Sequence, residues 1–123
     1  MNAIVFTKND MEYEVLSNVL AEEAADIIVE HEQNDGHFHL EKSYDLAVVA
    51  IDGAQGMEVV LEYRERFKET FVIWITNGPY FAGIAIRTHI FDFILRPLTA
   101  NRFREAVRNL MDRRIDAWQR VQV

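Results

Sequence analysis

The feature that most restricts the fold is the regular alternation of short apolar runs with segments of helical spacing. Five runs, rich in β-branched and aromatic residues, have the length and composition of strands buried on both faces. They lie at residues 3–7, 26–29, 46–51, 71–76 and 91–95. Strands that alternate with helices predict right-handed crossovers and a mostly parallel sheet with helices on both faces. We therefore expect an α/β fold.

Apolar residues at helical spacing predict helices after most of these runs. After the second run, the turn signal at residues 34–36 leaves room for only one short helix. The expected helices lie at about residues 10–20, 38–43, 57–67, 80–88 and 99–120. Asn9 or Asp10 is the expected cap of the first helix, and Thr99 is the expected cap of the last. The residues of these two helices that are expected to face the core are Met11, Val15, Leu16, Val19, Leu20, Phe103, Val107 and Leu110.

Length and charge limit the class of protein. The chain has 123 residues, so residues 1–123 are expected to form one domain, whose last helix extends as a linker or interface. Its formal net charge of −7 would repel nucleic acids and anionic membranes. It has no cysteine, no apolar run near the ~20 residues of a membrane helix, and no signal-peptide pattern at its start. The sequence predicts a cytoplasmic protein with neither a membrane nor a nucleic-acid partner.

Three segments, taken in order, resemble a known family. They are YDLAVVAID at residues 44–52, WIT at residues 74–76 and FDFILRPL at residues 91–98. Together they are similar to the third, fourth and fifth strands of receiver domains of bacterial response regulators, above all receivers joined to a LytTR-type DNA-binding domain. The resemblance covers about residues 3–110. It implies a flavodoxin-like (βα)5 fold, with a doubly wound parallel sheet of five strands in the order 2-1-3-4-5, and a role in two-component signal transduction.

The positions that carry phosphoryl transfer in receivers are mostly changed. The resemblance places Ala50 at the phosphoacceptor, Thr7 and Lys8 at the acidic pair, and Arg96 at the site lysine, while Thr76 keeps its hydroxyl. The acceptor carboxylate attacks phosphorus, and Mg²⁺, which prefers oxygen ligands, neutralises the transferring group. Alanine has no nucleophile, and arginine does not replace lysine. We therefore expect a pseudo-receiver that acts by protein–protein interaction, with no enzymatic activity, no metal and no other cofactor.

Two carboxylates leave alternatives open at this site. Asp52 lies two residues beyond Ala50, on the same side of a continuing strand, and is a candidate displaced phosphoacceptor that would require Mg²⁺. Alternatively, Asp52 is a turn residue before Gly53. Asp10 either pairs with Asp52 at the carboxyl edge of the sheet or only caps the first helix. A third hypothesis is that the vacated pocket binds a small molecule.

Three histidines and an aromatic residue are also candidate functional residues. His37 and His39, on one side of an extended segment, form a candidate metal pair or are merely exposed. Phe93 falls at the aromatic switch position of receivers, where the ring swings inward on activation. Alternatively, Phe93 is a packed strand residue. His89 is expected in a loop.

The last helix is basic, whereas the rest of the chain is acidic. Its arginines are Arg102, Arg104, Arg108, Arg113, Arg114 and Arg120. Apolar residues continue beyond the core stripe as Met111, Ile115 and Trp118, with Arg114 beside them. One interpretation is a solvated helix with intrachain charge pairs. The other is an interface for a homodimer, a partner protein or an output domain, because Trp and Arg are enriched in interfaces.

Overall fold

The computed structural model has a sheet of five parallel strands in the order β2-β1-β3-β4-β5, which confirms the predicted flavodoxin-like fold. The structure describes residues 1–33 and 42–122, and the side chains of the last helix as far as Arg113. The strands are β1 (Asn2–Thr7), β2 (Ile28–Glu32), β3 (Leu46–Ala50), β4 (Phe71–Thr76) and β5 (Asp92–Leu95).

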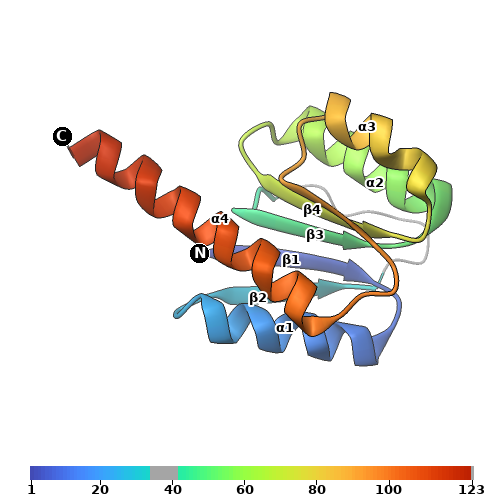
Figure 1. The fold of residues 1–123 in the computed structure, drawn as a ribbon, viewed down its shortest axis with the longest axis horizontal. Helices are drawn as coiled ribbons and strands as arrows, with labels where there is room; N and C mark the ends of the chain where they lie inside the picture. The colour runs from blue at the N-terminus through green and yellow to red at the C-terminus, as the bar shows by residue number, and fades with distance from the viewer. Residues whose placement is uncertain (34–41, 123) are drawn as a thin grey trace.

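Helices cover both faces of the sheet (Figure 1). On one face lie α1 (Asp10–Glu23) and α4 (Ala100–Gln122). On the other lie α2 (Gly53–Arg66) and, after a 3₁₀ turn at Pro79–Phe81, α3 (Ala82–Arg87). The chain returns through α4 against the strand direction, and the last turns of α4 project past the amino edge of the sheet. None of the described helices is both long and apolar enough to cross a lipid bilayer.

The central strands carry two apolar layers. In β4, Ile73 and Ile75 belong to the layer under α1 and α4, whereas Val72 and Trp74 belong to the layer under α2 and α3. This double burial explains why β1, β3 and β4 are apolar at nearly every position rather than at alternate ones. The three residues of α4 that were predicted to face the core are fully buried in the first layer, namely Phe103, Val107 and Leu110.

The edge strand and the first helix differ from the prediction. β2 begins at Ile28 rather than at residue 26, because Asp26 has a φ of 65° and belongs to the turn before the strand. As an edge strand, β2 is polar and only partly buried, so a search for apolar runs places it too early. In α1, Leu16, Val19 and Leu20 are buried as predicted. Met11 and Val15 are exposed, because they lie on another side of the helix.

Two other helix predictions need correction. α2 begins at Gly53, four residues before the predicted start at residue 57. Residues 42–45 are not helical, so the predicted helix at 38–43 is wrong at its end, and the rest of it lies outside the described residues. Thr99 does cap α4, because its hydroxyl oxygen accepts from the Arg102 amide over 3.1 Å.

Two glycines place the start of α2 close behind β3. Gly53 has a φ of 74°, which residues with a Cβ rarely adopt. A Cβ at Gly56 would lie 1.8 Å from the carbonyl oxygen of Ile51, so a larger residue would push the helix away. Together they set Asp52, the N-cap residue of α2, at the carboxyl edge of the sheet.

Candidate functional site

The carboxyl ends of four neighbouring strands bring the predicted site positions to one edge. Ala50 ends β3 and pairs in register with Thr7 at the end of β1. Thr76 ends β4, and Arg96 follows β5 directly. The Arg96 amide donates to the carbonyl oxygen of Thr76 over 3.0 Å, which holds the segment after β5 against β4.

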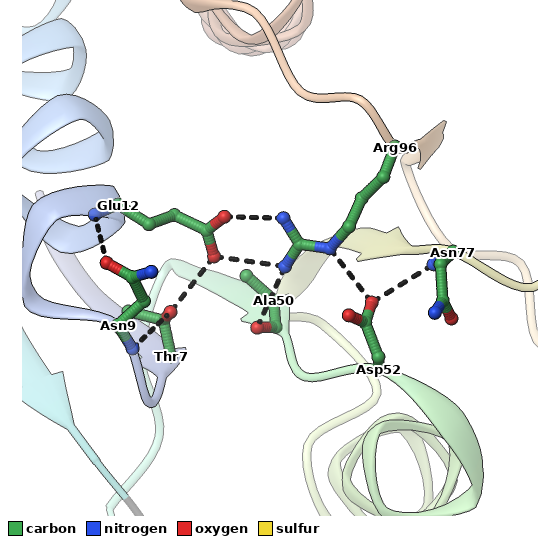
Figure 2. Close-up of polar contacts among 7 residues, drawn as sticks. All are labelled: Thr7, Asn9, Glu12, Ala50, Asp52, Asn77 and Arg96. Carbon is green, nitrogen blue, oxygen red and sulfur yellow. Dashed lines mark hydrogen bonds and ion pairs between the residues drawn. The ribbon is translucent and has the colours of Figure 1, made fainter.

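The Arg96 side chain crosses this edge and joins two carboxylates (Figure 2). Its guanidinium donates to both oxygens of Glu12, with 3.0 Å between Nη2 and Oε1, and its Nε donates to Asp52 Oδ1 over 2.9 Å. Nη2 also donates to the carbonyl oxygen of Ala50 over 3.3 Å. We call Arg96 with these three partners the Arg96 network. The bond to Glu12, above all, raises the pKa of Arg96. A guanidinium is a permanent cation in any case.

Glu12 is the site residue that sequence analysis missed. It is the third residue of α1, and its amide donates to the side chain of the N-cap residue Asn9 over 3.0 Å. This spacing is typical of a capping box, in which the glutamate bonds back to the cap. Here the carboxylate bonds instead to Arg96 and accepts a 2.9 Å bond from the Thr7 hydroxyl. The available signal was an Asn-x-x-Glu pattern directly after a strand.

Asp52 lies beyond the strand rather than in it. β3 ends at Ala50, so the expectation of a continuing strand through Asp52 was wrong. Its side chain makes no capping bond to α2. Instead Oδ1 accepts from Arg96 and from the amide of Asn77, the latter over 3.0 Å. Asp52 therefore links the loop after β3 to the loop after β4 and to the segment after β5.

The other predicted positions have local partners. Besides its bond to Glu12, the Thr7 hydroxyl accepts from the Asn9 amide over 3.3 Å. Lys8 is exposed, and its Nζ donates to Gln55 Oε1 over 2.6 Å. Thr76 is fully buried, and its hydroxyl oxygen accepts from the Gly78 amide over 3.3 Å. These hydroxyls thus support the loops at the edge of the site.

A cavity of about 420 Å³ opens among these residues, a size within the range of small-molecule sites. A magnesium ion there would need several oxygen ligands. The two carboxylates of the lining, Glu12 and Asp52, both bond to Arg96, and Lys8 adds a second cation. In the part of the chain that the structure describes, no three His, Cys, Asp or Glu side chains form a possible metal site. The residues present do not fit the metal that the receiver resemblance implies.

Neither interpretation of Asp10 holds. Asn9, not Asp10, caps α1. The Asp10 carboxylate accepts a 2.7 Å bond from Gln33, which follows β2, whereas Asp52 bonds with Arg96. The two aspartates therefore have separate partners at different points of the edge.

Phe93 packs against Trp74 of the neighbouring strand. The two rings are nearly perpendicular, with an interplanar angle of 82° and centroids 5.4 Å apart. This contact favours the packed-strand interpretation. His89 lies in the loop between α3 and β5, with a φ of 53°. His37 and His39 lie outside the described residues, so the metal-pair hypothesis stays a prediction.

The first arginines of α4 pair within the chain. The N–O distances of these ion pairs are 2.9 Å for Arg102–Asp92, 2.9 Å for Arg104–Glu22 and 3.0 Å for Arg108–Glu23. For this part of α4 the solvated-helix interpretation is favoured. Among the interface candidates, Met111 packs against the core layer under α1 and α4. The side chains of Arg114, Ile115 and Trp118 lie outside the described part of the chain.

Solved structures of receiver domains share this fold. The receiver domain of AraT, a response regulator from Geobacillus stearothermophilus, has a TM-score of 0.74 at 22% identity, over 95% of this chain and 97% of that one. A signal receiver domain of a histidine kinase from Clostridium thermocellum has a TM-score of 0.74 at 21% identity, over 88% of this chain and 94% of that one. The response regulator DrrB from Thermotoga maritima has a TM-score of 0.74 at 16% identity, over 92% of this chain and 53% of that one.

This chain therefore spans about half the length of DrrB, at 53%. No family model matches the sequence, and no curated protein does. At these low identities the likeness shows the receiver fold, and function has to be argued from the residues of the site.

Proposed function

We propose that this chain is a pseudo-receiver, a signalling module that has the receiver fold, acts by protein–protein contact and is not switched by aspartyl phosphorylation. The observation that carries the proposal is the Arg96 network. The two carboxylates are matched in charge by the guanidinium and Lys8 together, at the edge where a receiver would take Mg²⁺ and a phosphoryl group. Neither Mg²⁺ nor a phosphoryl group would therefore find an uncompensated charge to bind there. We propose that the protein does not require Mg²⁺.

The end of β3 supports the same proposal. Ala50 is 4% exposed and carries only a methyl group, so it cannot attack phosphorus. Asp52 has a carboxylate, and its phosphorylation is the alternative function. However, its Oδ1 already accepts two hydrogen bonds, from Arg96 and from the Asn77 amide. Such bonds stabilise the carboxylate as it is and oppose its use as a nucleophile.

Incubation with acetyl phosphate and Mg²⁺ should leave the intact mass of the protein unchanged. The reason is that Ala50 has no nucleophile and that the Asp52 carboxylate is held by Arg96. Mass spectrometry of the wild type and of Asp52→Asn, treated side by side with a phosphorylatable receiver as positive control, makes the measurement. A gain of one phosphoryl group that disappears in Asp52→Asn would establish the alternative, and a gain that persists would reveal another acceptor. Either gain contradicts the proposal.

The proposed contact surface is the end of α4, which projects past the sheet (Figure 1). Helical spacing places Ile115 and Trp118 on one stripe with Met111. Burying two such side chains against a second copy would contribute about 1.5–3 kcal/mol each. We propose self-association through this stripe. The sequence resemblance to receivers of LytTR-type regulators makes a transcriptional output domain the proposed target of the signal.

The variant Ile115→Asp with Trp118→Ala should stay folded but lose the dimer. Light scattering should give a dimer mass for the wild type and a monomer mass for the double variant, while the far-UV circular dichroism stays the same. Met11→Asp is the matched control, because Met11 is a 79% exposed apolar residue on α1. It should leave the mass unchanged. A monomeric wild type, or a double variant that is unfolded because these residues are core, would refute the interface.

A further inference from the structure

We propose that the amino edge of the sheet carries an oxyanion site that takes one phosphate-type group. A cavity of about 150 Å³ lies there, and its lining includes four basic side chains, Arg64, Lys68, His89 and Arg113. They come from the end of α2, the loop after it, the loop before β5, and α4. The Arg96 network lies at the opposite edge, so this proposal is independent of the proposed function.

The charge of this cavity is opposite to that of the molecule. The formal net charge is −7, yet the lining has three permanent cations and a single acidic residue, Glu69. Earlier arginines of α4, such as Arg108, pair with carboxylates of α1. Within the described residues, neither Arg113 nor Lys68 has a carboxylate within ion-pair distance. Uncompensated positive charge that converges on a concave surface attracts anions.

Arg64 is held in place for this role. Its Nε donates to the carbonyl oxygen of Thr88 over 3.0 Å, and its Nη1 donates to that of Thr70 over 2.6 Å. Both acceptors are neutral, so these bonds orient the guanidinium without cancelling its charge. A fixed, planar guanidinium presents its remaining N–H groups in the fork that suits phosphate oxygens.

The negative ends of helices do not fully explain why these four basic side chains lie together. α2 ends at Arg66 and α3 at Arg87, and the negative end of a helix attracts cations without any ligand. That effect accounts for Arg64 and for Lys68, which lies just after α2. Arg113 comes from α4, which continues to Gln122, so it has no helix end of its own here. Its presence in the lining needs another reason.

The size and the walls of the cavity define the ligand class. A volume of about 150 Å³ is below the ~300–1,000 Å³ of sites for whole small molecules, so it suits one anionic group. Phe71 and Phe91, with ring centroids 5.6 Å apart, form an apolar part of the lining. A neighbouring cavity of about 630 Å³ shares residues 68–71 and offers space for the rest of a ligand. A phosphate monoester with an apolar body fits both features.

Phenyl phosphate should bind saturably to the whole chain, and more tightly than inorganic phosphate, because the phenyl ring gains the aromatic wall. Lys68→Gln with Arg113→Gln should weaken this binding by roughly tenfold or more, since two charge-assisted bonds are lost. Arg64 is left intact because its carbonyl bonds are structural. Calorimetry gives the affinities, and NMR titration of the wild type should shift the amides of residues 68–71 and His89.

The matched control is Lys42→Gln with Arg108→Gln, which removes the same charge at positions outside this cavity and outside the cavity beside Arg96. This control variant should keep most of the affinity for phenyl phosphate. Equal weakening in the two double variants would mean that phosphate responds to net charge only. A titration that does not saturate, or shifts centred on Ala50 and Arg96, would also overturn the site. The wild-type titration decides the matter even if the Lys68 and Arg113 variant fails to fold.

Discussion

Replacing Trp74 with alanine should lower the free energy of unfolding by about 3–5 kcal/mol, a large part of the ~5–15 kcal/mol that holds an ordinary domain folded. Trp74 is fully buried in β4. Its ring packs against Phe81 and Phe93, with centroid distances of 5.3 and 5.4 Å. Because the core is close-packed, the cavity left by the indole cannot be filled by small shifts. Urea unfolding followed by far-UV circular dichroism measures the loss without relying on tryptophan fluorescence.

Trp74→Phe provides the matched control. The indole Nε1 is buried and has no hydrogen-bond partner in the described structure. Phenylalanine keeps the aromatic contacts and removes this unsatisfied donor, which offsets part of the lost packing. We therefore expect a much smaller loss than for Trp74→Ala. A loss below ~1 kcal/mol for Trp74→Ala would contradict the placement of this residue in the core.

The sequence predicts the interior of the fold better than its margins. β4 spans residues 71–76 as expected, because a strand buried on both faces is apolar at every position. β2 is an edge strand that contains Glu30, His31 and Glu32, and such a strand has no continuous apolar run to mark it. The start of α2 was placed too late for a different reason, since Gly53 and Gly56 look like turn residues until their close approach to β3 is known.

The site is predicted in part, because its positions follow from strands but its contacts do not. The ends of β1, β3 and β4 fix where Thr7, Ala50 and Thr76 lie. The partner of Arg96, however, is Glu12, which is 84 residues away in the sequence. No local pattern relates two residues at that distance, and only the packing of α1 beside the segment after β5 brings them together. The same holds for the basic cavity, to which separate segments contribute.

Replacing Arg96 with methionine should lower the free energy of unfolding by about 1.5–3 kcal/mol, the range for hydrogen bonds to charged groups. The side chain of Glu12 is only 14% exposed, and the substitution would remove its cationic partner. Arg108→Met is the matched control, because the Arg108 side chain is 64% exposed and such surface pairs contribute about 0–1 kcal/mol. In the double variant with Glu12→Gln, the combined loss should be smaller than the sum of the single losses.

The same substitution should loosen the carboxyl edge of the sheet. The Asn77 amide donates to Asp52, whose Oδ1 also accepts from Arg96, so losing the guanidinium should speed hydrogen exchange at Asn77. Arg108→Met should leave that amide unchanged. Arg96→Lys should restore only part of the protection, since one ammonium cannot replace a guanidinium fork that bonds with Glu12, Asp52 and Ala50 together. If stability and exchange in Arg96→Met both match the wild type, the Arg96 network holds nothing in place. The proposal of a pseudo-receiver would then lose the observation on which it depends.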